Sequence, residues 1–217
     1  MKSIQFKLIN AVCLFVLMPA AFAVTGTQML KEFHQSVKSF EAEFKQKVVD
    51  NKDKELQSAA GKMYLQRPGK FRWDYKEPDE QVIVSNGKKI WLYDQELEQV
   101  TIKTLKGMVG STPARILSDT GSIDKNFTIT EQGKKDGVTW IELKPKEEDP
   151  QFKTVRIGFT DTLKVMEIKD NLDQVTTIEF SKLKKNPTLK ASLFEFKIPE
   201  GVDVVKDPAA KLQTKAK

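Results

Sequence analysis

The stretch Lys70-Phe71-Arg72-Trp73-Asp74-Tyr75 decides the fold because charged and aromatic residues alternate along it without a break. Successive side chains of a β-strand point to opposite faces of a sheet, so Phe71, Trp73 and Tyr75 share one face. This period of two predicts a strand with one apolar, inward face and one solvated face. Half-buried strands of this kind are typical of antiparallel sheets.

Strand patterns continue on both sides of this stretch. Upstream, Phe40, Ala42 and Phe44 alternate with charged residues. Downstream, the Asn-Gly pair of the segment Ser85-Asn86-Gly87-Lys88 predicts a type I′ hairpin turn. Because short turns separate the strands, the chain is predicted to form a meander and not a βαβ series. The other predicted strands are 56–65, 81–84, 89–93, 97–102, 127–130, 138–143, 154–159, 163–168, 175–183 and 194–198.

Two short helices complete the pattern. The first is predicted to begin at Thr25, which stands at capping-box spacing from Gln28. The second is predicted after Thr112 as its N-cap with Pro113 at its first position. The apolar faces of the two helices carry Leu30, Phe33, His34 and Val37 in the first and Ile116 and Leu117 in the second.

About ten strands with two short helices predict a mainly β fold. A sheet that curls into a barrel, with its mouth covered by the helices, uses every element. A flat sheet of this width would leave one apolar face exposed to water. Either the protein's own side chains or a ligand must therefore occupy the concave side.

The first 23 residues have the features of a secretory signal peptide. Lys2 and Lys7 are basic, 8–17 is apolar, and Ala21-Phe22-Ala23 fits a cleavage site. The apolar run is shorter than the ~20 residues that a membrane-spanning helix requires. We therefore expect an exported protein whose residues 24–217 form a single domain, with the last ~10 residues flexible.

Composition argues against most catalytic chemistry. Cys13, the one cysteine, lies within the predicted signal peptide, so disulfides, thiolate metal sites and thiol nucleophiles are not expected afterwards. His34 is the one histidine, and a role on a helix face fits it better than catalysis. No nucleotide or metal motif is present. The net charge of +6 is not interleaved with aromatics as in nucleic-acid-binding patches. We expect a binding domain without catalytic residues, metal or cofactor.

The segment Gly61-Lys62-Met63-Tyr64-Leu65-Gln66-Arg67-Pro68-Gly69-Lys70-Phe71-Arg72-Trp73 resembles the LolA family of periplasmic outer-membrane lipoprotein carriers. The segment 84–93, Leu97-Glu98-Gln99-Val100 and Ser111-Thr112-Pro113 fit the same family in order and spacing. The resemblance implies an incomplete, strongly curved antiparallel β-barrel of about 10–11 strands, covered by a lid made from the two helices.

The resemblance also implies a function and its partners. Family members accept triacylated lipoproteins from an ATP-driven inner-membrane release complex of the LolCDE type. They carry this cargo across the periplasm to the outer-membrane receptor LolB. By this resemblance the chain is expected to be a monomeric, non-enzymatic chaperone that shields acyl chains in a hydrophobic cavity and binds no nucleic acid.

The resemblance assigns roles to particular residues. Arg67 occupies the position of an arginine that hydrogen-bonds lid carbonyls and holds the empty carrier closed. A guanidinium, with five donors in a rigid fork, suits several carbonyls at once. Arg115 makes the second lid helix less apolar than in other members. Acyl-chain contacts are predicted for Leu30, Phe33, Val37, Phe40, Phe71, Trp73, Tyr75, Ile116 and Leu117, for which plain core packing is an equal alternative.

Two other functions stay open from the sequence. A periplasmic regulator that senses lipids or mislocalised lipoproteins could use the same fold, although such regulators carry a second domain. A hydrolase could use carboxylates that converge from distant positions. LolB itself is similar, but it requires a lipidated cysteine at the mature N-terminus, where Cys13 does not lie.

Overall fold

The computed structural model describes residues 24–104, 113–118, 123–148, 150 and 152–206. The predicted signal peptide, the residue Thr112 and the predicted flexible tail lie outside these residues. Within the described part, no helix is long and apolar enough to span a membrane. The helices are α1 (Gly26–Ser36), α2 (Pro113–Ser118), α3 (Ile123–Asn126) and the 3-10 helix η1 (Ala191–Phe194).

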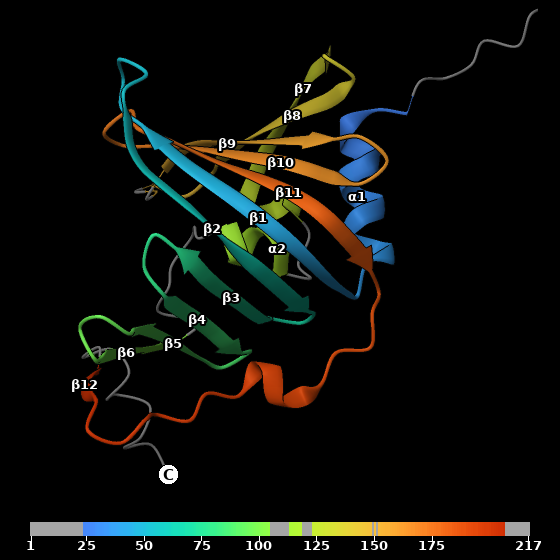
Figure 1. Cartoon of the computed structure of the whole chain (residues 1–217). Helices are drawn as coiled ribbons and strands as arrows, with labels where there is room; N and C mark the ends of the chain where they lie inside the picture. The colour runs from blue at the N-terminus through green and yellow to red at the C-terminus, as the bar shows by residue number, and fades with distance from the viewer. Residues whose placement is uncertain (1–23, 105–112, 119–122, 149, 151, 207–217) are drawn as a thin grey trace, which may run out of the picture.

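The described residues form one sheet of 12 strands in the order β12-β6-β5-β4-β3-β2-β1-β11-β10-β9-β8-β7. The ends of this order are not paired to each other, so the sheet is an open, incomplete barrel, as expected (Figure 1). Its strands are β1 (Ser39–Val49), β2 (Glu55–Gln66), β3 (Lys70–Glu77), β4 (Gln81–Asn86), β5 (Lys89–Asp94), β6 (Gln99–Thr104), β7 (Phe127–Lys135), β8 (Val138–Pro145), β9 (Phe152–Phe159), β10 (Leu163–Asp170), β11 (Val175–Lys185) and β12 (Asp203–Lys206).

Strand β1 stands at the centre of this order and joins two antiparallel meanders. It pairs with β2 on one side and with β11, more than 100 residues later, on the other. Phe44 lies opposite Gly61 in β2 and Phe180 in β11, so aromatic groups of both halves meet on one face. The predicted alternation at Phe71 and Trp73 is confirmed, since both are buried on that face in β3.

Strand β2 pairs with β1 on one side and with β3 on the other, and its pairing with β3 is irregular at Gly61. The pairing register shifts between Ala60 and Gly61. A Cβ atom at Gly61 would stand 2.0 Å from the backbone oxygen of Asp74. Only a residue without a side chain allows the two strands to approach this closely.

The C-terminal segment corrects the sequence prediction. Residues 194–198 were predicted as a strand, but η1 ends at Phe194 and no strand follows until β12. The apolar alternation serves packing on the outer face instead: Phe194 is buried, and the Phe196 ring lies 5.6 Å from that of Tyr93. Strand β12, which was not predicted, pairs in parallel with β6.

The turn at Gly87 is also different from the predicted type. A type I′ turn requires positive φ at both central residues. Here Gly87 has φ 88°, whereas Lys88 does not have a positive φ. The loop is therefore not of type I′, and the amides of Lys88 and Lys89 donate to the side-chain oxygen Oδ1 of Asn86.

Gly61→Ala should destabilise the protein by about 1–3 kcal/mol or more, because the added methyl group meets backbone and not a movable side chain. Chemical denaturation measures this loss. Ser58→Ala, an exposed position in the same strand, is the matched control and should change stability little. A Gly61→Ala variant as stable as the unsubstituted protein would contradict the close approach.

Candidate functional site

The concave face of the sheet and helices α1 and α2 share one hydrophobic cluster. In Figure 1, α2 lies behind β1 and β2, and α1 lies beside the ends of β10 and β11. Tyr75 is only partly buried and packs against the cluster. The structure thus brings together residues from four separate segments of the chain. The predicted contact residues buried in the cluster are Leu30, Phe33, Val37, Phe40, Phe71, Trp73, Ile116 and Leu117.

Described side chains of the helices pack against the concave side of the sheet. Phe33 of α1 packs against Phe40 of β1 and Phe159 of β9, with ring centroids 5.9 and 6.2 Å apart. Leu30, Val37 and Leu117 are each 1% exposed. Among the residues that the structure describes, side chains of the helices and of the sheet therefore pack against each other on this face.

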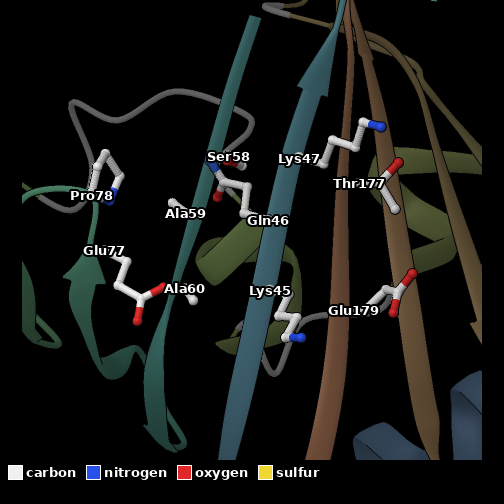
Figure 2. Close-up of a pocket in the computed structure, with 10 residues that line it drawn as sticks. All are labelled: Lys45, Gln46, Lys47, Ser58, Ala59, Ala60, Glu77, Pro78, Thr177 and Glu179. Atoms are coloured by element: carbon white, nitrogen blue, oxygen red, sulfur yellow. The ribbon is translucent and has the colours of Figure 1, made fainter. Parts of the chain in front are cut away.

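A cavity of about 710 Å³ lies on the opposite, outer face (Figure 2). Its lining residues Lys45 and Lys47 lie opposite Glu179 and Thr177 in the β1–β11 ladder, on the face away from Phe44. Charged walls open to water do not suit an acyl chain, so this cavity is not the site expected from the sequence.

The side chain of Arg67, the residue after β2, forms hydrogen bonds with the ends of both helices. Its Nε and Nη2 donate to the Leu117 carbonyl of α2, at 3.1 and 2.7 Å. Its Nη1 donates to the Phe33 carbonyl of α1 at 3.4 Å and to the Val37 carbonyl at the helix end. The guanidinium carbon also lies 5.2 Å from the Phe33 ring centroid. We call this set of contacts the Arg67 latch.

The latch holds a charge that is almost out of water. Arg67 is 8% exposed, and none of the ion pairs among the described residues includes it. Burial lowers its pKa to about 10, so it stays protonated at neutral pH. The last carbonyls of a helix lack intrahelical partners and carry partial negative charge. The helix ends therefore supply the acceptors that a carboxylate would otherwise supply.

Glu131 of β7 fastens the other end of α1, a contact that the sequence did not predict. Its Oε2 accepts from the Gly26 amide at 3.0 Å and its Oε1 from the Thr27 amide at 2.8 Å. The predicted Thr25–Gln28 capping box is confirmed beside it. Partial burial alone would raise the pKa of Glu131, but hydrogen bonds from Thr27, Gly26 and Thr25 outweigh it and lower the pKa.

Lowering the pH should loosen the N-terminal end of α1. A carboxyl group with a depressed pKa stabilises the bound state fully above its ordinary pKa, and this contribution is lost as the pH falls through the depressed pKa. Hydrogen-exchange protection of the Gly26 and Thr27 amides, corrected for intrinsic rates, should decrease as acid protonates Glu131. In Glu131→Gln it should already be low at neutral pH, whereas the exposed-site control Glu147→Gln should keep it. Equal protection in Glu131→Gln and the unsubstituted protein would contradict the anchor.

His34 and Arg115 were also predicted to lie in the two lid helices. His34 is half-buried on α1, with its ring edge-on to that of Phe33 at 6.0 Å, which fits a helix-face role. The side chain of Arg115 lies outside the described residues. Helix α2 itself begins at Pro113 as predicted.

Comparison with known proteins places the chain in a family. The family described as "Outer membrane lipoprotein carrier protein LolA" matches residues 35–197. The chain belongs to the LolA family. A protein of Methylococcus capsulatus named "Outer-membrane lipoprotein carrier protein" is 47% identical over 184 residues, which cover 84% of this chain and 88% of that protein. A protein of Nitrosomonas europaea with the same name is 39% identical and covers 95% and 100%.

A solved structure supports the fold. An uncharacterized conserved protein from Thermus thermophilus superposes with a TM-score of 0.54 at 11% identity, covering 83% of this chain and 98% of that one. At this identity the likeness concerns the fold alone. The family name describes a carrier, which confirms the expectation of a non-enzymatic protein and favours neither the regulator nor the hydrolase. The printed names of these relatives refer to lipoproteins of the bacterial outer membrane.

Proposed function

We propose that this LolA-family protein is the periplasmic chaperone that carries acylated lipoproteins to the outer membrane. The observation that carries the proposal is the Arg67 latch, in which one buried guanidinium binds the carbonyls of both lid helices over an apolar cluster. Such a device keeps apolar surface away from water until a ligand takes its place.

A carrier has to bind its cargo firmly and still release it. Burying one acyl chain of ~16 carbons at ~0.8 kcal/mol per methylene gives at most ~12 kcal/mol. Hydrogen bonds to a charged group contribute ~1.5–3 kcal/mol each. Because opening the lid breaks the bonds of Arg67 before an acyl chain enters, the latch offsets part of the gain from acyl burial. Release then becomes possible without another energy source in the carrier.

The lid side chains and the concave wall are the proposed acyl-chain contacts. Once α1 and α2 move away, Phe40, Phe71 and Trp73 would line an apolar wall with Tyr75 at its border. From the lid, Leu30, Phe33, Val37, Ile116 and Leu117 would cover the acyl chains, as they now cover the wall.

The partners proposed are those that the family resemblance implies. Triacylated lipoproteins would come from an inner-membrane ABC release complex of the LolCDE type and go to the receptor LolB. The signal peptide proposed for residues 1–23 would export the chain, and residues 24–217 would form the carrier domain, acting as a monomer.

Arg67→Leu should accept cargo but fail to pass it on, because the closed state loses its charged hydrogen bonds while the apolar wall is kept. Loss of even one such bond should raise the affinity for lipoprotein by about tenfold or more. Arg67→Lys, which keeps the charge but not the planar fork, should lie between the two. Transfer of purified lipoprotein to LolB is the measurement. A leucine variant that delivers cargo at the unsubstituted rate would refute the role of the latch.

Photoreactive residues at Trp73 and Leu117 should crosslink to the acyl chains of lipoproteins in living cells. Both positions are buried in the apolar cluster, 3% and 1% exposed. Position Leu172, 74% exposed in the turn between β10 and β11, is the control and should not crosslink. Crosslinks at Leu172 but at neither buried position would count against acyl binding on the concave face.

A further inference from the structure

The indole of Trp73 carries an unsatisfied polar group in the apolar wall. The residue is 3% exposed, and its Nε1–H finds no acceptor in the described part of the chain. Its partners across the strands on this face are Met63 of β2 and Ile83 of β4, whose side chains offer no oxygen or nitrogen. Buried tryptophans usually find a hydrogen-bond partner for this group. The indole N–H of Trp73 is therefore a buried donor for which the described residues supply no acceptor.

Aromatic rings fix the position of this donor. The Trp73 ring lies 4.8 Å from Phe44, 6.2 Å from Tyr75 in a stacked arrangement and 6.5 Å from Phe180. Packing on several sides prevents the indole from turning its N–H toward water. An indole can only donate, so the missing partner has to be an acceptor.

The burial along β3 indicates which end of a bound acyl chain lies here. Phe71 is 1% exposed and Trp73 3%, whereas Tyr75 is only partly buried. The Tyr75 hydroxyl already donates to Gln46 Oε1 at 3.2 Å, and burial raises the pKa of this hydroxyl to about 12. Trp73 thus lies next to Tyr75 on the same face of β3, on the side of the more deeply buried Phe71. An acyl chain has acceptors only at its head end, in the carbonyl that links it to the glycerol or amine.

We propose that the Trp73 indole donates a hydrogen bond to an acyl carbonyl, ester or amide, of the bound lipid anchor. This assignment rests on the proposed carrier function and adds its chemical specificity: linked acyl chains are preferred to plain hydrocarbon. The bond exists only in the loaded protein, whereas the Arg67 latch exists only in the empty one. The two polar contacts bias the same lid equilibrium in opposite directions.

The test uses the protein from Val24 onward and three synthetic lipopeptides with the same peptide and chain lengths. The first has two ester-linked and one amide-linked palmitoyl chains, the second replaces the esters by ethers, and the third also replaces the amide by an alkylamine. The unsubstituted protein should bind the first about three- to tenfold more tightly than the third. In Trp73→Phe, which keeps an aromatic ring but not the N–H, the ratio should approach one.

Comparing the two proteins cancels differences between the lipopeptides that do not involve the indole. Trp91→Phe is the matched control, since Trp91 packs against Phe196 of the C-terminal segment and should keep the ratio of the unsubstituted protein. If the unsubstituted protein binds the ether lipopeptide as weakly as the third lipopeptide, the acceptor is the ester. If it binds the ether lipopeptide as tightly as the first, the acceptor is the amide. Either result supports the proposal.

A ratio in Trp73→Phe equal to that of the unsubstituted protein would overturn it. If this variant does not fold, the nuclear magnetic resonance signal of the Trp73 indole N–H decides instead. It should shift and exchange more slowly with the first lipopeptide than with the third, and identical behaviour would overturn the proposal. Failure of the unsubstituted protein to bind any of the three would refute the carrier function itself, which is a different result.

Discussion

A buried guanidinium that forms no ion pair with any described carboxylate is the constraint on which the lid depends. Burying an unpaired charge is costly unless polar groups replace water around it. Around Arg67 these groups are the carbonyls at the ends of α1 and α2, so the two helices must be brought together for the charge to be satisfied. The carboxylate of Glu131 accepts hydrogen bonds from the Gly26 and Thr27 amides at the opposite end of α1. Opening the lid therefore means exposing a charge and an apolar wall together.

The apolar cluster between the helices and the concave face gives this constraint its functional meaning. An apolar cluster alone would make a stable protein with no reason to open. Polar contacts at its border shift the equilibrium between the closed and the loaded state, because each contact is made in only one of these states. Arg67 is satisfied in the closed state, and we infer that Trp73 is satisfied in the loaded one. The carrier needs both kinds of contact to take up cargo and then to give it up.

The sequence predicted those parts of the structure that depend on local periodicity and capping. The strand at Phe71 and Trp73 and the helix after Thr25 follow directly from spacing. It also placed every proposed acyl contact in or beside one cluster. It failed at Phe194, where alternation served packing on the outer face instead of pairing. Glu131 was not found, since nothing in a sequence indicates which helix end a carboxylate 105 positions away will reach.

The hydrogen-exchange rate of the Arg67 Nε proton tests the central claim most directly. It can be followed by nuclear magnetic resonance in the empty protein and after loading with a triacylated lipopeptide. The account predicts slow exchange in the empty protein, where Nε donates to the Leu117 carbonyl at 3.1 Å, and fast exchange in the loaded one. Equally slow exchange in both forms would mean that cargo binds with the latch closed, and would contradict the account.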